Sequence, residues 1–212
     1  MLDIMTPPDH PAPQPDPRAF LLTQTDRDVV LGLVKTFSDH AREKNRKILF
    51  VSITYKESND YPVTAAAASN HLKRFHLHFA RMLCKTRHLE LERFRKIEPI
   101  LFAFLDVPGS KPKHYNSKVV PQQESTFHHH CILIADDQYV DQLDALTVPA
   151  AADSCARKLS EHCNVRTLNV QRVEQSEHAL IRVTDYCTYH SRKRTDEYAY
   201  QVFPISKSEF KK

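Results

Sequence analysis

The chain has 212 residues, of which 41% are hydrophobic, and it carries a formal net charge of +4 at pH 7. This length and composition fit one globular domain that can bury a core of its own. Only two glycines occur, Gly32 and Gly109, so neither of the glycine-rich phosphate-binding motifs of nucleotide-binding folds can be written.

The cysteines and the hydropathy pattern bear on the compartment in which the protein is expected. The five cysteines are odd in number and include no Cys-x-x-Cys pair, which argues against a disulfide framework and favours reduced thiols. The N-terminus is acidic and rich in proline, unlike a signal peptide. No apolar stretch approaches the roughly 18 residues of a membrane span. We therefore expect a cytoplasmic protein with no membrane partner.

The first part of the chain is predicted to be a tail followed by alternating helices and strands. Residues 1–18 hold six prolines and are expected to be disordered. Thr25 is a candidate cap for a first helix, 47–56 is rich in β-branched and aromatic residues and predicts a strand, and a second helix is expected over 64–85. The apolar stripes are Val29, Val30, Leu33, Val34 and Phe37 in the first helix, and Leu72, Phe75, Phe79 and Met82 in the second.

The remaining elements predict an α+β fold. In chain order they are strands over 99–107 and 127–135, helical segments within 138–163, a strand over 164–173, a helix over 176–193 and a strand over 198–205. Pro108, Gly109 and Ser110 signal a turn, and 110–125 reads as a polar loop. We expect one domain over 19–206, a central antiparallel sheet with helices on its faces, and a basic tail over 207–212.

Three consecutive histidines lie inside the apolar, strand-like segment 127–134. Alternate side chains of a strand point to the same face, so His128 and His130 are expected to project together while His129 points away. Two imidazoles held in this way can bind one divalent metal ion. The alternative is a pair of partly exposed strand histidines with no metal.

A second His-x-His sequence, His76 and His78, tests this interpretation. It falls within the apolar stripe of a predicted helix, where residues two apart lie about 200° around the axis. These two histidines cannot share a metal, and we expect them at the helix surface or against a phosphate backbone.

Asp106 ends the apolar segment that precedes the histidine strand. If the two strands pair antiparallel, the end of the first lies beside His128. A carboxylate there completes a set of two histidines and one acid, which suits Mg²⁺ or Mn²⁺. The alternative is an aspartate that only caps the following turn.

Two tyrosines and two cations follow on the predicted helix 176–193. Tyr186 and Tyr189 are three residues apart and would share a face, and Arg192 and Lys193 follow one turn later. A tyrosine phenol has a pKa near 10 and is a poor nucleophile unless a cation stabilises its phenolate. Such a tyrosine can attack phosphorus and become covalently joined to DNA. The alternative is that the tyrosines pack in the core and the cations are solvated.

Basic residues are concentrated between residues 71 and 96, a segment that contains eight Lys or Arg and only two Glu. A local excess of this kind suits a polyanion, although a solvated helix face explains it equally well. The candidates for contacts with a DNA backbone are Lys73, Arg74, Arg81 and Lys85.

Taken in order, the acid that ends LFAFLD, the strand FHHHCILI and the helix YCTYHSRK resemble the HUH endonucleases, a superfamily of rolling-circle replication initiators, relaxases and transposases. SITYK followed by HLKRFHLHFARML also resembles initiators of bacterial plasmids and filamentous phages. The resemblance covers residues 47–206 and implies a sheet of the ferredoxin or RRM type. Three features depart from the family pattern. His129 replaces a hydrophobic residue, Arg192 replaces the usual lysine with Lys193 adjacent, and two residues instead of three separate the tyrosines, which favours Tyr189 over Tyr186 as the single nucleophile.

The resemblance implies a metal-dependent enzyme that nicks and joins single-stranded or hairpin DNA, initiating rolling-circle replication. His128, His130 and Asp106 would hold Mg²⁺ or Mn²⁺, Tyr189 would form a 5′-phosphotyrosine link, and Arg192 or Lys193 would stabilise the developing charge. No helicase motif follows, so a host helicase would unwind the duplex. The alternatives are a relaxase or transposase, a non-catalytic sequence-specific DNA-binding protein, or a zinc protein that uses histidine and cysteine.

Overall fold

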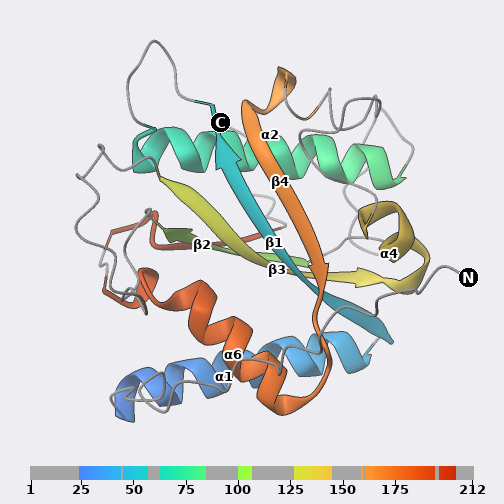
Figure 1. The fold of residues 1–212 in the computed structure, drawn as a ribbon, viewed down its shortest axis with the longest axis vertical. Coiled ribbons are helices and arrows are strands. Elements are labelled where there is room, and N and C mark those ends of the chain that lie inside the picture. The colour runs from blue at the N-terminus through green and yellow to red at the C-terminus, as the bar shows by residue number, and fades with distance from the viewer. Residues whose placement is uncertain are drawn as a thin grey trace, which may run out of the picture.

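A computed structural model gives the fold of the chain (Figure 1). It describes residues 24–43, 45–56, 63–84, 100–106, 127–144, 159, 161–193 and 196–203, without the side chains of 80–84, 141–144 and 193. The expected tails, the turn at 108–110 and the polar loop lie outside these residues. No helix in the described part of the chain is both long enough and apolar enough to cross a membrane.

The elements follow the order that the sequence predicts. They are α1 (Gln24–Glu43), β1 (Arg46–Tyr55), α2 (Ala65–Cys84), β2 (Ile100–Asp106), β3 (His128–Asp136), α4 (Asp137–Asp144), β4 (Val165–Arg172), α6 (Glu177–Thr188), the 3₁₀ helix η2 (Ser191–Lys193) and β5 (Tyr200–Phe203). The strands form one sheet in the order β4-β1-β3-β2-β5, and every neighbouring pair is antiparallel. The predicted α+β class with an antiparallel sheet is confirmed.

Helices cover both faces of the sheet, so the protein has three layers. Helix α2 lies along one face, and α1 and α6 lie along the other (Figure 1). Alternation along the strands divides the core accordingly. On β3, Cys131 and Leu133 face the α2 layer, whereas Ile132 and Ile134 face the α1 and α6 layer. The parity of a strand residue therefore decides which layer its side chain joins.

The buried stripes explain why the helices form where they do. In α1, Val30, Val34, Phe37 and Ala41 are buried at intervals of three and four residues, which gives one apolar face. Val29, expected in that stripe, is instead 44% exposed. The helix already includes Gln24, so Thr25 lies inside it and the predicted cap is wrong.

The apolar stripe predicted for the second helix is confirmed at three positions of α2. Leu72, Phe75 and Phe79 are buried in the core on this side of the sheet. Thr64 precedes the helix, and its Oγ1 accepts a hydrogen bond from the amide of Ala67, at 3.2 Å. His76 corrects an expectation, because it is 3% exposed and its ring lies 4.7 Å from that of Phe203 on β5. It packs in the core and does not lie at the surface.

The helix predicted over 176–193 is shorter than expected. Ser176 caps α6, and its Oγ accepts a hydrogen bond from the amide of Ala179 at 3.3 Å. The helix ends at Thr188, Tyr189 is its C-cap, and η2 follows after a turn. The tyrosine and cation motif therefore spans a helix end and a separate 3₁₀ turn.

Candidate metal centre

The pairing of β2 with β3 brings an acid and two histidines to one face of the sheet. In this register Asp106 is opposite His128, and Phe104 is opposite His130. Directly opposed residues of an antiparallel pair share a face, and so do residues two apart on one strand. Asp106, His128 and His130 therefore project together on the side of α1 and α6, as the sequence predicts.

The ligand atoms of these three residues converge. The Nε2 atom of His130 lies 3.2 Å from Oδ2 of Asp106, and the Nε2 atom of His128 lies 4.0 Å from the same oxygen. The two Nε2 atoms are 3.2 Å apart. Asp106 and His130 are buried and His128 is half-buried, so the ligands are shielded from most competing water.

These separations fit a metal ion. A point equidistant from the three atoms lies about 2 Å from each of them, which is the distance at which nitrogen and oxygen ligands bind Zn²⁺ or Mg²⁺. One carboxylate with two imidazoles suits Mg²⁺, Mn²⁺ or a harder transition ion. Within the described residues the group contains no cysteine, which counts against the predicted zinc alternative based on histidine and cysteine.

The middle histidine of the triplet faces the opposite layer, as predicted. His129 is 1% exposed, and its Nδ1 lies 2.8 Å from the hydroxyl oxygen of Tyr55. Burial lowers the pKa of His129 to about 3, with smaller contributions from His128 and His130. The imidazole is therefore neutral at physiological pH. It takes no part in a site between His128 and His130 because its side chain points to the other face of the sheet.

Tyr186 lies against the metal centre. Its ring centroid is 4.8 Å from that of His130 and 5.8 Å from that of Phe50, and Phe50 in turn stacks on His130 at 5.6 Å. Tyr186 is nevertheless 45% exposed. An exposed phenol thus borders two rings, one of which carries a candidate metal ligand.

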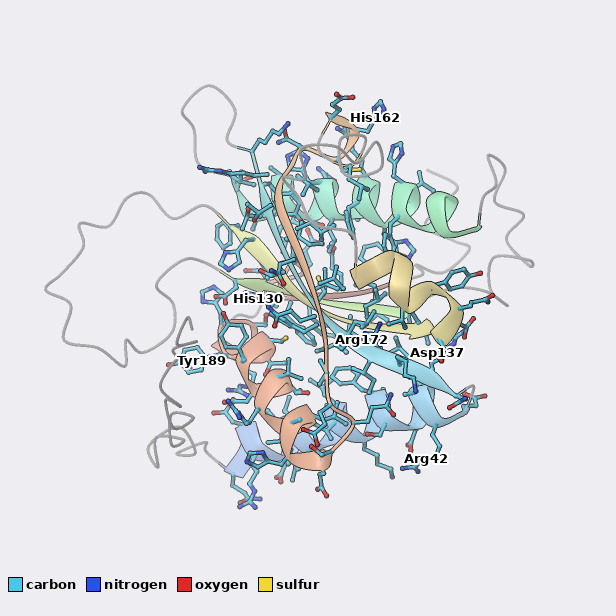
Figure 2. The ribbon with its side chains drawn as sticks, turned by 45° about the vertical axis from the view of Figure 1, so that its right-hand side comes forward. Arg42, His130, Asp137, His162, Arg172 and Tyr189 are labelled. Atoms are coloured by element: carbon cyan, nitrogen blue, oxygen red, sulfur yellow. The ribbon has the colours of Figure 1, made fainter. Side chains whose placement is uncertain are left out.

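Tyr189 lies at the end of α6, one turn beyond Tyr186. Its φ of −51° and ψ of −47° continue the helical direction, and its side chain is half-buried. Figure 2 shows Tyr189 and His130 on the same side of the molecule, with Tyr189 beside the C-terminal end of α6. Tyr186 is on α6 and Tyr189 is its C-cap, and α6 covers the face of the sheet that carries the three candidate ligands.

Arg192 forms ion pairs with two acidic side chains, Asp185 and Asp26. Its Nη2 donates to Oδ1 of Asp185 at 2.7 Å and its Nε lies 3.3 Å from Oδ1 of Asp26 on α1, while Nη1 donates to Oγ1 of Thr188 at 3.0 Å. The Arg192 side chain is 8% exposed. The guanidinium thus joins the end of α6 to α1, a role that the sequence did not suggest. Lys193 belongs to η2, and its side chain lies outside the described part.

The predicted DNA-binding residues are not brought together with the metal centre. Lys73 and Arg74 are exposed on α2, which covers the face of the sheet opposite to the three ligands. The Arg81 side chain and Lys85 lie outside the described residues. Any contact between Lys73 or Arg74 and a nucleic acid would therefore engage the other layer of the protein.

A strip of small polar residues beside the centre was missed by the sequence analysis. Ser52 on β1 pairs with His130 on one side and with Asn169 on the other, and Oγ1 of Thr54 lies 2.5 Å from Oγ1 of Thr167. Asn169 and Thr167 are on β4, and Thr167 is exposed. The alternation of polar with apolar residues along β1 and β4 was the available signal, but the face it marks is known only once the strands are paired.

The geometry thus combines three convergent side chains that could hold a metal ion, an exposed tyrosine and a polar strip of sheet. Within the described residues this is the one group of acidic, histidine or cysteine side chains arranged to hold a metal ion. Comparison of the chain with models of known protein families, with curated proteins and with solved structures finds no match.

Proposed function

We propose that the protein is a member of the HUH endonuclease superfamily that nicks and joins single-stranded DNA through a tyrosine. The observation that carries the proposal is the convergence of Asp106, His128 and His130 beside the exposed ring of Tyr186. A metal centre with an adjacent phenol supplies the two components that transesterification of a phosphodiester requires, an electrophile activator and a nucleophile.

The three ligands hold a divalent metal, Mg²⁺ or Mn²⁺, in this proposal. When bound, the cation acts as a Lewis acid toward a phosphate oxygen and neutralises developing negative charge. The chain contributes the rigid spacing of the ligands, because Asp106 and His128 are directly paired on β2 and β3. The buried positions of Asp106 and His130 strengthen their electrostatic effect.

The tyrosine forms the covalent link. Its phenol loses a proton as Oη attacks phosphorus, the new Oη–P bond replaces the P–O3′ bond, and the departing 3′-oxygen takes up a proton. The product is a 5′-phosphotyrosine and a 3′-hydroxyl, which can reverse the reaction without another energy source. The contact with His130 supports Tyr186 as the nucleophile, and Tyr189, which the family pattern favours, lies one turn away.

Initiation of rolling-circle replication is the proposed process, with single-stranded or hairpin DNA as substrate and a host helicase as partner. The polar strip of β1 and β4 beside the ligands supports access of an extended strand. A relaxase or transposase of the same superfamily would use the same chemistry on another target.

Incubation with labelled single-stranded DNA and Mn²⁺, using a pool of candidate hairpin origins, tests the proposal. We expect a protein–DNA band that survives denaturation, requires the metal and disappears in Asp106→Asn. Tyr186→Phe and Tyr189→Phe identify the nucleophile, because the band is lost only when the attacking tyrosine is replaced. Tyr200→Phe is the matched control, since Tyr200 is 60% exposed on β5 and is expected to leave the band intact.

Tight DNA binding without a covalent band for any substrate would contradict the proposed chemistry. That outcome would instead support the non-catalytic DNA-binding protein. Persistence of the band in Tyr186→Phe together with its loss in Tyr189→Phe would keep the chemistry and move the nucleophile to the end of α6.

A further inference from the structure

A buried polar pair lies directly behind the metal centre, on the other face of the sheet. The hydroxyl of Tyr55 and Nδ1 of His129 are 2.8 Å apart, and each residue is 1% exposed. The two rings meet edge to face, with centroids 5.8 Å apart and planes at 82°. If either group lost its partner, the other would remain buried without a hydrogen bond and the folded state would be destabilised. The two side chains are therefore strongly held together.

The pair lies where β3 separates from β1. The β1–β3 register runs from Arg46 opposite Asp136 to Ile53 opposite His129, which is its last pair. Beyond that point β1 continues against β4 alone, with Tyr55 opposite Val165. The Tyr55 side chain reaches back to His129 and so joins the two strands just past the end of their ladder.

The adjacent metal ligands depend on this end of β3. His130 still has a neighbour on β1, since it pairs with Ser52, whereas His128 pairs with Asp106 on β2 and lies beyond the end of the β1 register. Phe127 adds one contact by donating its amide hydrogen to the carbonyl of Val63, at 3.1 Å. The Tyr55–His129 bond is therefore the side-chain tie between β1 and the residue that separates the two histidine ligands.

Because residues 128–130 are all histidines, their side chains alone do not determine the register in which β3 pairs with its neighbours. A shift of one residue would move every side chain of β3 to the opposite face. His129 would then enter the metal side between Phe127 and Cys131, and only one histidine would face Asp106. A hydrophobic residue between two histidines would resist this shift by its burial, but the middle residue here is itself a histidine.

We propose that Tyr55 is a positioning residue, which through its hydrogen bond to His129 selects the register that presents His128 and His130 to Asp106. The inference rests on the metal centre of the proposed function and not on the nicking reaction. Tyr55 touches no ligand atom and acts entirely through His129.

Titration of the proteins with Mn²⁺ alone, followed by calorimetry, tests the role. We expect Tyr55→Phe to weaken Mn²⁺ binding on the order of tenfold, as loss of a supporting contact does at other metal sites. The double variant Tyr55→Phe with His129→Leu should recover most of that affinity, because a leucine in the middle of the triplet restores a strong preference for one inward-facing register. Thermal unfolding of each variant measures stability separately.

Val51→Ala is the matched control. Val51 is 2% exposed on the same face of β1, four residues before Tyr55, so it should lower stability and leave Mn²⁺ affinity unchanged. NMR contacts between the backbones of Ile53 and His129 give a second readout, and we expect them to weaken in Tyr55→Phe and return between the same two positions in the double variant.

A merely structural pair would change stability in Tyr55→Phe but leave the Mn²⁺ affinity and the NMR contacts of the folded protein as in the wild type. That result, or a double variant no better than Tyr55→Phe, would overturn the positioning role. The binding assay contains no DNA, so failure of the nicking reaction alone leaves the role standing. Absence of Mn²⁺ binding by the wild-type protein would overturn the metal centre and the positioning role together.

Discussion

The rings of Tyr186 and His130 lie with their centroids 4.8 Å apart, which joins helix α6 to the strand that carries two of the three candidate metal ligands. The contact makes the position of the tyrosine depend on two structures, the β3 strand and the anchor that holds the end of α6. Arg192 provides that anchor through Asp26 on α1. Separate substitutions can test the candidate metal centre, the Arg192 anchor and the buried ionisable groups of the core.

Mn²⁺ is expected to stabilise the folded protein through the three ligands. A ligand that binds only the folded state, at about 100 times its dissociation constant, adds about 2.7 kcal/mol to the free energy of unfolding. We expect Mn²⁺ to raise the melting temperature of the wild type and to have no such effect on Asp106→Asn. Thermal unfolding with and without the metal measures both, and an equal rise in the variant would exclude Asp106 as a ligand.

Replacement of Arg192 by glutamine should lower stability by about 1–3 kcal/mol, because it removes the charged hydrogen bond to Asp185 and the ion pair with Asp26. Urea unfolding measures the loss. Arg182→Gln, exposed on α6, is the control and should change stability by less than about 0.5 kcal/mol. A variant with wild-type stability and abolished nicking would instead assign Arg192 to the phosphate, as the family resemblance implies.

Asp136→Ala tests a buried ion pair at the far end of the β1–β3 ladder. Oδ1 of Asp136 lies 2.8 Å from Nε of Arg46, whose side chain is 3% exposed. Its loss leaves a buried cation without its acid and should cost about 3 kcal/mol, the lower end for such pairs because Asp136 is 25% exposed. Mn²⁺ affinity should not change, and a large change would show that the whole ladder controls the metal centre.

Acid is expected to destabilise the protein through His76. Burial lowers the pKa of His76 from 6.5 to about 4. Below pH 6.5 the unfolded chain therefore binds a proton that the folded chain refuses, so stability falls as pH falls and levels off below pH 4. A pKa lowered by about 2.5 units, at about 1.4 kcal/mol per unit, corresponds to a loss of about 3.5 kcal/mol in the free energy of unfolding by pH 4.

The control for this pH dependence is His76→Leu. Unfolding free energies measured between about pH 7 and pH 4 should fall less steeply in the variant than in the wild type. Equal slopes would show that His76 is protonated in the folded protein despite its buried contact with Phe203.

Alternation and helical spacing were sufficient to predict the order of the elements and the convergence of Asp106, His128 and His130. These inferences need only the local period of the backbone and one antiparallel pairing between consecutive strands. The interior position of His76 was missed, because a helix stripe does not show how wide its buried face is. Here the edge strand β5 extends the sheet beneath α2 and covers this histidine.

The contacts between distant segments could not be predicted. Arg192 follows Tyr189 at a spacing that suggests phosphate binding, but Asp26 on α1 reaches the same guanidinium. Likewise, nothing near His129 in the sequence indicates Tyr55 as its partner. Both contacts depend on which helix covers which face and on the exact register, which are properties of the whole sheet.

Strand β2 ends at one candidate metal ligand, Asp106, and strand β3 begins at another, His128, and these two residues are directly paired. The segment 107–126 is thus bracketed by the ligands themselves. Since strand pairing fixes the separation of these two side chains, the spacing between the carboxylate and the imidazole follows from the β2–β3 register and not from their distance along the chain.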